Sequence, residues 1–285
     1  MRRPIFSVGL AALILVIWPV TALAATQPRL GTATSFAVLA GAGITNTGAT
    51  TTTGDMGTFP TTSETGFGPG ANSVTFNGGS VNHAGDAVTQ GAKNDLVTAY
   101  TDAANETPCT VLGTLTGQNL TPGTYCFSSS AALTGPLTLT GFGVYVFQIG
   151  SSLTTASAST VLLAGGAQAC GVYWQVTSDA TFGTNSTFQG TVMALSSITM
   201  TTGMTLIGRA LARNGAVTMD TNTITRPAAL CSGLPTSTGT VVPGSTGIPL
   251  EMQGEFPWLL LLGLGAGGAA AVMGLSGRRR RRRNA

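Results

Sequence analysis

A short unit that recurs along the chain limits its fold more than any other feature. Five eight-residue segments align without gaps, and each opens with an apolar residue followed by threonine; they begin at Ile44, Leu153, Ala180, Ile198 and Val217, with a partial sixth at Leu137. Successive side chains on a strand point to opposite faces, so this pattern predicts a buried apolar side and an exposed threonine side. From Leu137 onward the units begin 16 to 27 residues apart, which is typical of the rungs of a solenoid.

The alternation assigns individual side chains to the two sides of each strand. We expect four pairs to point inward: Leu137 and Leu139, Ala180 and Phe182, Ile198 and Met200, and Val217 and Met219. The residues between and after them, such as Thr199 and Thr201, are then expected to point outward.

Composition supports an all-β fold. Only 8% of the residues are charged and 40 are glycine, whereas helix surfaces usually carry many Glu, Lys and Arg side chains. The hydrophobic content of 43% is sufficient for a packed core. A helical bundle, an ordinary α/β enzyme and a disordered chain are all disfavoured.

One stretch, residues 84 to 104, has helical periodicity. Its small or apolar residues recur every three to four positions, at Ala84, Val88, Ala92, Leu96, Ala99 and Ala103. The charged residues Asp86, Lys93, Asp95 and Asp102 lie off that stripe. The sequence therefore predicts a single amphipathic helix that interrupts the solenoid and covers part of its apolar wall.

Both ends of the chain have the pattern of targeting or membrane segments. Residues 1–24 are typical of a secretory signal peptide, with an uncleaved N-terminal anchor as the alternative. At the other end, the uncharged stretch Phe256 to Ser276 precedes six arginines, Arg278 to Arg283, which predicts a transmembrane helix over 255–277 and a cytoplasmic tail over 278–285. We expect an exported body (25–233), held at the cell surface by a Pro/Gly/Ser/Thr linker (234–254).

A second interpretation of the C-terminal region is cell-wall attachment. Leu234 to Gly239, followed by an apolar span and a basic tail, resembles a sortase sorting signal. It departs from that signal by having two residues between Pro235 and Thr238 instead of one. Cell-wall anchoring or release is therefore the less favoured expectation for localisation.

Export bears on the four cysteines, because disulfides persist outside the cell. Four cysteines allow three pairings; we expect Cys109–Cys126 and Cys170–Cys231, with unpaired buried thiols as the alternative. No CxxC pair is present and His83 is the single histidine, so no metal site is expected.

Charge and acid placement argue against two functional classes. Residues 25–250 contain five basic and eight acidic side chains and no basic stripe, which disfavours nucleic-acid binding. The acids are scattered, so no pair of carboxylates indicates a hydrolase or lyase, and no catalytic residue or cofactor is expected. Arg209 and Arg213 with Asp220 could mark a site, but a structural ion pair is the favoured interpretation.

The outward threonines suggest a different kind of activity. Neighbouring rungs lie about 4.8 Å apart and alternate residues on a strand about 6.6 Å apart. Both spacings are close to oxygen spacings in ice, so a rigid lattice of threonine hydroxyls and methyls could hold ordered water. The competing explanation is that threonine is simply a favourable residue on an exposed strand.

Several segments carry a family resemblance: residues 30–39, 143–150, 170–176, 180–190 and 208–218. Together they resemble the microbial ice-binding proteins of the discontinuous β-solenoid family, over about residues 30–227. The resemblance implies a right-handed solenoid of triangular section, one long helix alongside and one flat ice-binding side. The motif Thr-Ala/Gly-x-Thr/Asn found in some members is matched at 47–50 and 202–205, whereas 184–187 departs at its second position.

These arguments define the predicted ice-binding residues. We expect Thr181, Thr199, Thr201 and Thr218 on one flat surface, joined by Thr205 or Thr187 if the turn does not carry them to the next side. The remaining candidates are Thr154, Thr184, Thr47 and Thr50. The expected partners are ice and, through the C-terminal helix, the membrane. The alternative function is a surface adhesin that binds glycan, or a structural surface protein without ice activity.

Overall fold

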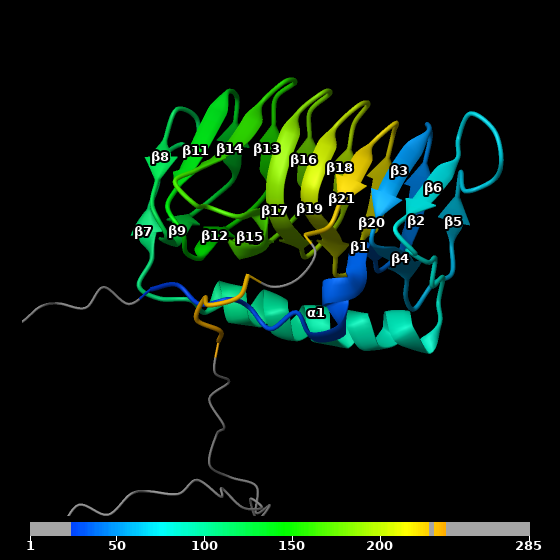
Figure 1. Ribbon diagram of the computed structural model, residues 1–285, viewed down its shortest axis with the longest axis horizontal. Helices are drawn as coiled ribbons and strands as arrows, with labels where there is room; N and C mark the ends of the chain where they lie inside the picture. Colours follow the sequence, from blue (N-terminus) through cyan, green and yellow to red (C-terminus); the bar gives the residue numbers. More distant parts are fainter. Residues whose placement is uncertain (1–23, 228–230, 238–285) are drawn as a thin grey trace, which may run out of the picture. The chain divides into compact units, whose positions relative to one another are not determined.

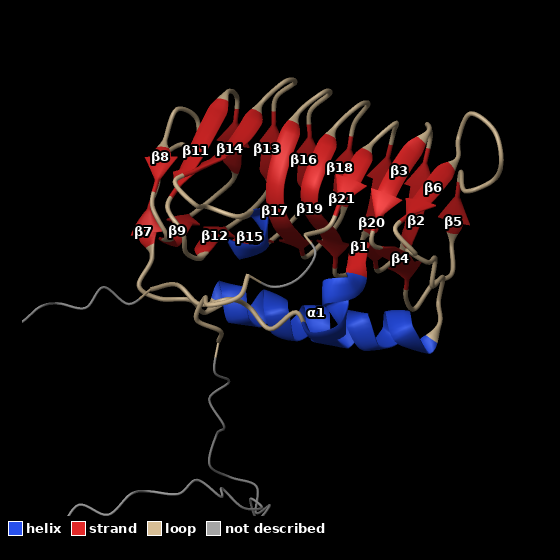
Figure 2. Cartoon of the chain, in the orientation of Figure 1, coloured by secondary structure: helices blue, strands red, loops and turns tan. Residues whose placement is uncertain are grey.

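The described part of the chain is a solenoid of short strands with one long helix along its side (Figures 1 and 2). A computed structural model describes residues 24–227 and 231–237. All strand pairings among them are parallel, which confirms the predicted mainly-β solenoid.

The helices are α1 (Ala87–Ala104) and two 3-10 turns, η1 (Gly31–Ser35) and η2 (Ala169–Gly171). The strands are β1 (Phe36–Ala40), β2 (Gly43–Asn46), β3 (Thr50–Thr53), β4 (Asp55–Thr58), β5 (Glu64–Thr65), β6 (Val74–Asn77), β7 (Thr110–Val111), β8 (Asn119–Leu120), β9 (Gly123–Phe127), β10 (Ala131–Leu133), β11 (Pro136–Thr140), β12 (Tyr145–Ile149), β13 (Leu153–Thr155), β14 (Thr160–Ala164), β15 (Val172–Val176), β16 (Ala180–Phe182), β17 (Thr187–Ala194), β18 (Ile198–Met200), β19 (Thr205–Ala212), β20 (Ala216–Met219) and β21 (Thr223–Thr225).

The strands form three faces. The first face is a seven-stranded sheet in the order β10-β13-β16-β18-β20-β2-β5. The second face contains β8, β11, β14, β21, β3, β6 and the N-terminal halves of β17 and β19; the third contains β7, β9, β12, β15, β1, β4 and the C-terminal halves of β17 and β19.

Two glycines allow β17 and β19 to pass from the second face to the third without a break. Gly190 and Gly208 are paired at this bend, and Gly190 has a φ of 106°. A Cβ on Gly208 would lie 1.8 Å from the Gly190 carbonyl oxygen, so no other residue fits there.

The order of rungs in space differs from their order in the sequence. The first strands, β1 to β6, form two rungs at one end, and α1 then runs back along the side to β7 at the other end (Figure 1). The last rung therefore meets the first: β19, β20 and β21 pair with β1, β2 and β3. We call this junction the seam.

The core is built from the apolar side of the repeat. The eight side chains predicted to point inward are all fully buried. Aromatic rings from successive rungs stack inside, with centroids 5.5 Å apart for Tyr125 and Phe147 and 3.9 Å apart for Phe147 and Trp174. Full burial of each such side chain contributes roughly 1.5–3 kcal/mol.

One unit of the predicted repeat was aligned incorrectly. Leu137 lies on β11 in the second face, whereas the first-face strand of that rung is β10, in which Ala131 pairs with Leu153. The reason is that β10 has Ala132 where the other units have threonine, so the apolar-threonine pattern next matches one strand later.

Helix α1 begins later than predicted and buries a different stripe. Asp86 caps it by accepting a hydrogen bond from the Thr89 amide. Ala84 and Val88 are exposed, whereas Thr89, Lys93 and Tyr100 are buried beside the predicted Ala92, Leu96, Ala99 and Ala103. The helix packs on the third face, against β1, β12 and β15.

Lys93 is the clearest departure from the predicted helix. Its ammonium group reaches the wall of the solenoid and donates hydrogen bonds to the carbonyl oxygens of Ala212 and Arg213. Burial lowers its pKa to about 8, with a smaller contribution from the Arg213 charge. A side chain expected to face water is instead a polar contact between helix and sheet.

Both expected disulfides are present, Cys109–Cys126 and Cys170–Cys231. The second holds residues 231–237, which we call the strap. Within it, the Pro235 carbonyl oxygen accepts a hydrogen bond from the Gln27 amide, and the Ser237 amide donates to the Gln27 carbonyl oxygen. Leu234 to Ser237, predicted as the start of the linker, therefore lie against the N-terminal segment of the body.

Several expectations concern parts of the chain outside the described residues. These are the signal peptide up to residue 23, the linker from residue 238, the transmembrane helix over 255–277 and the arginine tail. Within the described ranges, no helix has the length and apolarity needed to cross a membrane.

The contacts of Lys93 lead to a stability prediction. Lys93→Ala removes the donor to the buried Ala212 carbonyl oxygen and to the partly buried Arg213 carbonyl oxygen, so the free energy of unfolding should fall by about 1–3 kcal/mol. Asn94→Ala, at the adjacent exposed position, is the matched control and should change it by about 0.5 kcal/mol or less. Urea unfolding at pH 7 measures both, and equal midpoints for the two variants would contradict the assigned role.

Candidate functional site

Six threonines form an unbroken column along the first face. From strand to strand, Thr154 pairs with Thr181, Thr181 with Thr199, Thr199 with Thr218, Thr218 with Thr45, and Thr45 with Thr65. All six are at least partly exposed. We call this set the first threonine column; Ala132 extends its line by one rung.

The hydroxyls of this column are free of intramolecular bonds. Among the described residues, no hydrogen bond joins any of the six hydroxyl groups to another protein atom. Each threonine lies on a strand of two to four residues that pairs with the neighbouring rungs, so its backbone is held in place. β-branched side chains on strands also have few accessible rotamers. The column therefore presents ordered, unoccupied hydroxyls and methyls to solvent.

The residues that flank the first column are small. Backbone hydrogen bonds place Ser152, Asp179, Ser197 and Ser63 at equivalent positions just before the strands. On the other flank, after the strands, lie Ala156, Gly183, Thr201, Asp220 and Thr47. No long side chain occurs in either set, so the middle of this face is flat.

A second threonine column lies on the second face. It consists of Thr160, Thr187, Thr205, Thr223, Thr51 and Thr75, each paired with the next. These hydroxyls also make no hydrogen bond within the described part of the protein. The neighbouring outward column is uneven, because it mixes long and short side chains: Leu162, Gln189, Ile207, Thr225, Thr53 and Asn77.

The turn between the two faces explains where the other predicted threonines lie. Ala158, Asn185, Gly203 and Thr221 occupy stacked turn positions with φ between 54° and 73°. The chain changes direction there, so Thr187 and Thr205 are carried to the second face. Thr187 and Thr205 therefore do not share a surface with Thr199.

Threonines at this turn use their hydroxyls inside the protein. The Thr201 hydroxyl donates to the Phe182 carbonyl oxygen at 2.7 Å and lies 3.3 Å from the Thr184 hydroxyl. The Thr47 hydroxyl donates to the Met219 carbonyl oxygen. Thr184, Thr201 and Thr47 therefore stabilise the turn and lie beside the first column, outside its line.

Thr50 is a correction, because its side chain is buried. Its hydroxyl donates to the Asn46 side-chain oxygen and accepts from the Asn222 amide. The motif begins two residues after Thr45 but three residues after Thr199, so its last threonine falls one position earlier, and Thr51, not Thr50, pairs with Thr223. The motif at 47–50 matches in sequence but differs in structure from that at 202–205.

Comparison with known proteins gives this geometry a context. Residues 38–225 match the family model described as ice-binding-like. The chain is 46% identical to an ice-binding protein of Nostoc sp. (strain HG1), over 71% of this chain and 76% of that relative. It is 35% identical to an ice-binding protein of Flavobacterium frigoris (strain PS1), over 70% of this chain and 76% of that relative. The crystal structure of an ice-binding protein from an Antarctic biological consortium superposes with a TM-score of 0.69 at 46% identity, covering 74% of this chain and 96% of that one.

The chain belongs to the ice-binding-like family. The match covers the rungs that carry both threonine columns, and it confirms the family resemblance found in the sequence. The names of these relatives describe ice binding and no catalytic activity, in agreement with the expectation that the chain is not an enzyme.

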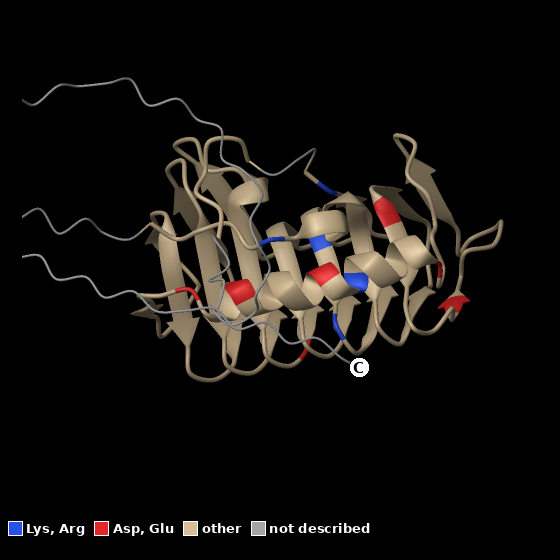
Figure 3. Cartoon of the chain, turned by 90° about the horizontal axis from the view of Figure 1, so that it is seen from below, with Lys and Arg blue, Asp and Glu red and all other residues tan. Residues whose placement is uncertain are grey.

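The charged residues of this family member lie mainly away from the threonine columns (Figure 3). Asp95 and Asp102 on the helix bind Thr32 and Arg29. On the first face, the Asp179 carboxylate accepts from the Ser197 amide and that of Asp220 from the Thr202 and Thr221 hydroxyls. No group of three potential metal ligands occurs among the described residues.

The expected ion pair between Arg209 or Arg213 and Asp220 is absent, and this prediction was wrong. Arg209 is buried and donates to the Thr34 and Pro227 carbonyl oxygens and the Thr191 hydroxyl, while Arg213 lies over the Tyr100 ring at 4.7 Å. Both arginines therefore have structural roles in the described part of the chain.

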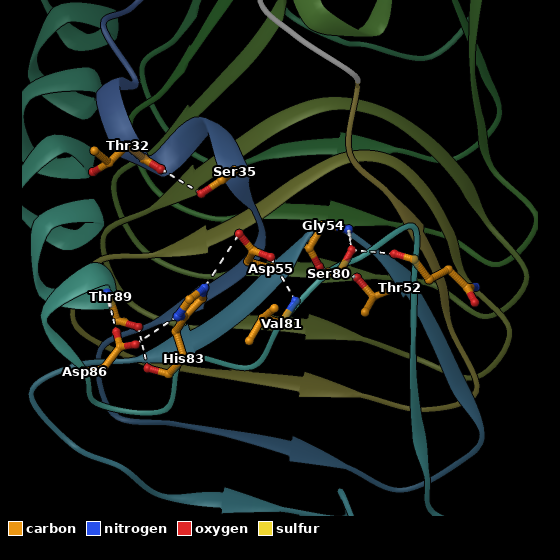
Figure 4. A network of polar contacts seen from close by, with 11 residues as sticks. Thr32, Ser35, Thr52, Gly54, Asp55, Ser80, Val81, His83, Asp86 and Thr89 are labelled. Carbon is orange, nitrogen blue, oxygen red and sulfur yellow. Dashed lines mark hydrogen bonds and ion pairs between the residues drawn. The ribbon is translucent and has the colours of Figure 1, made fainter.

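His83 takes part in a polar network at the start of the helix (Figure 4). Its Nδ1 is 2.8 Å from the Asp86 carboxylate and its Nε2 is 3.8 Å from that of Asp55. These carboxylates also accept from the Thr89 and Val81 amides. The hydrogen bond from Thr89 lowers the pKa of Asp86. The network attaches the helix to the end rungs, and both ring nitrogens of His83 face carboxylates.

Half of the twelve threonines in the two columns were not predicted. These are Thr45, Thr65, Thr160, Thr223, Thr51 and Thr75. A usable signal existed for some of them, because the eighth residue of the aligned units is Thr51, Thr160, Thr187 or Thr205. Thr65 follows Glu64 in place of an apolar residue, so no repeat pattern indicates it.

The contrast between Thr50 and Thr51 generates a prediction. Thr50→Val removes a buried hydroxyl that serves two partners, so the free energy of unfolding should fall by about 1–3 kcal/mol. Thr51→Val changes an exposed hydroxyl and should alter it by about 0.5 kcal/mol or less. Chemical denaturation of the two variants tests this, and a larger loss for Thr51→Val would mean that the register of β3 is wrong.

Proposed function

We propose that this protein binds ice through the first threonine column. The observation that carries the proposal is the set of six aligned threonines whose hydroxyls have no partner among the described residues. Family membership supports the same function, because the named relatives are ice-binding proteins.

The physical argument concerns spacing and rigidity. Strand spacing places successive hydroxyls about 4.8 Å apart, so the column covers about 24 Å of surface. Hydroxyls at this repeat can anchor water molecules in an ice-like arrangement, while the methyl groups occupy the spaces between them. Little side-chain entropy is lost on binding, since threonine on a strand is already restricted.

Flatness favours the first face over the second. The first column is flanked by serine, alanine, glycine and threonine, with two aspartates held by neighbouring donors. On the second face, Leu162 and Ile207 are exposed next to the threonine column and rise above it. A rigid crystal plane would contact those side chains first. The third face is covered by α1.

The proposal predicts different effects of one substitution at three places. Thr199→Tyr puts a bulky side chain in the middle of the first column, so it should remove most of the thermal hysteresis and ice recrystallisation inhibition. Thr205→Tyr, in the second column, should reduce them much less. Thr98→Tyr, on the helix, should leave them unchanged. Each variant should unfold within about 0.5 kcal/mol of the natural protein.

The pattern of results decides between surfaces. Full activity in folded Thr199→Tyr with loss in Thr205→Tyr would assign ice binding to the second face. Loss in neither variant, or no ice activity in the natural protein, would contradict the proposal and favour the adhesin alternative, which glycan binding by residues 25–237 would test.

We also propose that the body is displayed outside the cell on a membrane anchor. Support comes from the sequence: an apolar N-terminal stretch, the uncharged segment Phe256 to Ser276 and the arginines that follow it. In addition, the strap holds Ser237 near Thr26 and Glu106, beyond the C-terminal end of α1, and none of these three residues belongs to a threonine column.

Fractionation of cells that express the full chain tests this display. The protein should remain with membranes after washing in high salt and dissolve in detergent, and protease added to intact cells should digest the body. Release by salt alone, with the C-terminal segment still present, would contradict membrane anchoring.

A further inference from the structure

Glu64 occupies a position that is apolar in every other rung. On the first face it pairs with Ile44, in the inward line formed by Leu153, Ala180, Ile198, Val217 and Ile44. Those five side chains are buried in the core. Glu64 is therefore a carboxyl group that points into the end of the solenoid, next to Thr65, the last member of the first threonine column.

Two asparagines close the same end. Asn82 is bridged to Met56 of β4, and its side-chain amide donates a hydrogen bond to Glu64 Oε2. The side-chain amide of Asn46, which is buried two residues beyond Ile44 on β2, donates to the carbonyl oxygens of Gly48, Gly66 and Ser73. The end of the core is thus closed by polar groups that need partners.

Two of these polar atoms have no donor. Glu64 Oε1 and Asn82 Oδ1 are both buried, and neither has a hydrogen-bond partner among the described residues. An ionised carboxylate and an amide oxygen are both acceptors, so they cannot bond each other. Leaving buried acceptors unsatisfied is destabilising. A single proton placed on Glu64 Oε1 would serve both atoms.

We propose that Glu64 is held as a neutral carboxylic acid, paired with the side chain of Asn82 through two hydrogen bonds. In one bond the Asn82 Nδ2 group donates to Glu64 Oε2; in the other the Glu64 Oε1 hydroxyl donates to Asn82 Oδ1. The pair closes the β5 end of the core and makes the stability of that end depend on pH, independently of the proposed ice binding.

The surrounding charges are compatible with a neutral acid. The titratable groups nearest in the chain and on the adjoining rung are His83, Asp55 and Asp86, and these contact one another through the His83 ring. β2 and β5 contribute no other charged side chain. Burial raises the pKa of Glu64, opposed by the hydrogen bond from Asn82. No group of three potential metal ligands is present among the described residues, so a proton satisfies the pair more simply than a cation.

The direction of the pH effect follows from the raised pKa. Folding favours the neutral acid. Its contribution to the free energy of unfolding is therefore fully present below the ordinary carboxyl pKa of 4.5, and it is lost as the pH rises through the higher pKa of the folded protein. Glutamine at this position would carry a permanent donor and reproduce both hydrogen bonds at every pH.

The test is thermal unfolding of the natural protein and Glu64→Gln between pH 3 and pH 9. The two melting temperatures should agree at pH 3 to 4, and Glu64→Gln should melt about 2–4 °C higher at pH 8. Glu106→Gln is the matched control, because Glu106 accepts hydrogen bonds from Thr26 and Ser237 and should lose stability when half its acceptors are replaced.

A direct measurement keeps the proposal testable if the variant folds poorly. Carbon-13 NMR of the natural protein should show the Glu64 carboxyl titrating above pH 4.5. A normal titration, or Glu64→Gln less stable at every pH, would overturn the proposal. So would calcium ions that raise the melting temperature of the natural protein but not of Glu64→Gln, since that would assign the pair to a cation.

Discussion

The hydrogen bonds between stacked rungs are the constraint on which the rest of the structure depends. They fix the separation of neighbouring strands, and because the pairing is in register they also align side chains of the same kind along the axis. Inside, this alignment stacks Tyr125, Phe147 and Trp174; outside, it produces the threonine columns. A slip of one residue in any strand would exchange the two sides, and the apolar interior opposes that slip. The core thus maintains the regularity of the surface.

The part of the fold that follows from alternation could be predicted from the sequence. Apolar and threonine residues at successive positions were enough to assign inward and outward side chains in four units, and the helical periodicity of residues 84–104 predicted the helix alongside. Positions near the turns were harder to predict, because the same four-residue motif begins one position earlier at 47–50 than at 202–205 and so ends on the buried Thr50 instead of the exposed Thr51. Lys93 also escaped prediction, since its partners are backbone carbonyls 119 and 120 residues away that leave no mark in the side-chain pattern.

The hydrogen-bond state of each hydroxyl separates two kinds of threonine that the sequence cannot distinguish. Thr201 and Thr47 satisfy their hydroxyls within the turn, whereas Thr199 and Thr45 leave theirs to solvent. In both of the first two, the hydroxyl donates to the carbonyl oxygen of the neighbouring rung that also accepts the same residue's backbone amide. A surface that must order water needs the second kind, and the first kind keeps the edge of that surface rigid. The low charge of the chain fits this division, since long charged side chains on the first face would rise above the threonines.

Continuity of both columns across the seam requires long-range closure of the fold. Thr218 and Thr45, and likewise Thr223 and Thr51, are neighbours in space only because the last rung pairs with the first, where the hydroxyl of Thr47 meets a carbonyl 172 residues away. Arg209 and Lys93 lie close to this junction: one donates to the Thr34 carbonyl oxygen before β1, the other joins the helix to the end of β19. Each is a buried cation that binds carbonyl oxygens, and burial lowers the pKa of both. Burying a charge without an opposite charge is unfavourable, so each of these residues carries a desolvation free energy that an apolar side chain would not. Of the two, Arg209 bridges the last rung and the residues before β1, and so supports the register between last and first rungs. Two of the six threonines in each column depend on that register for their alignment.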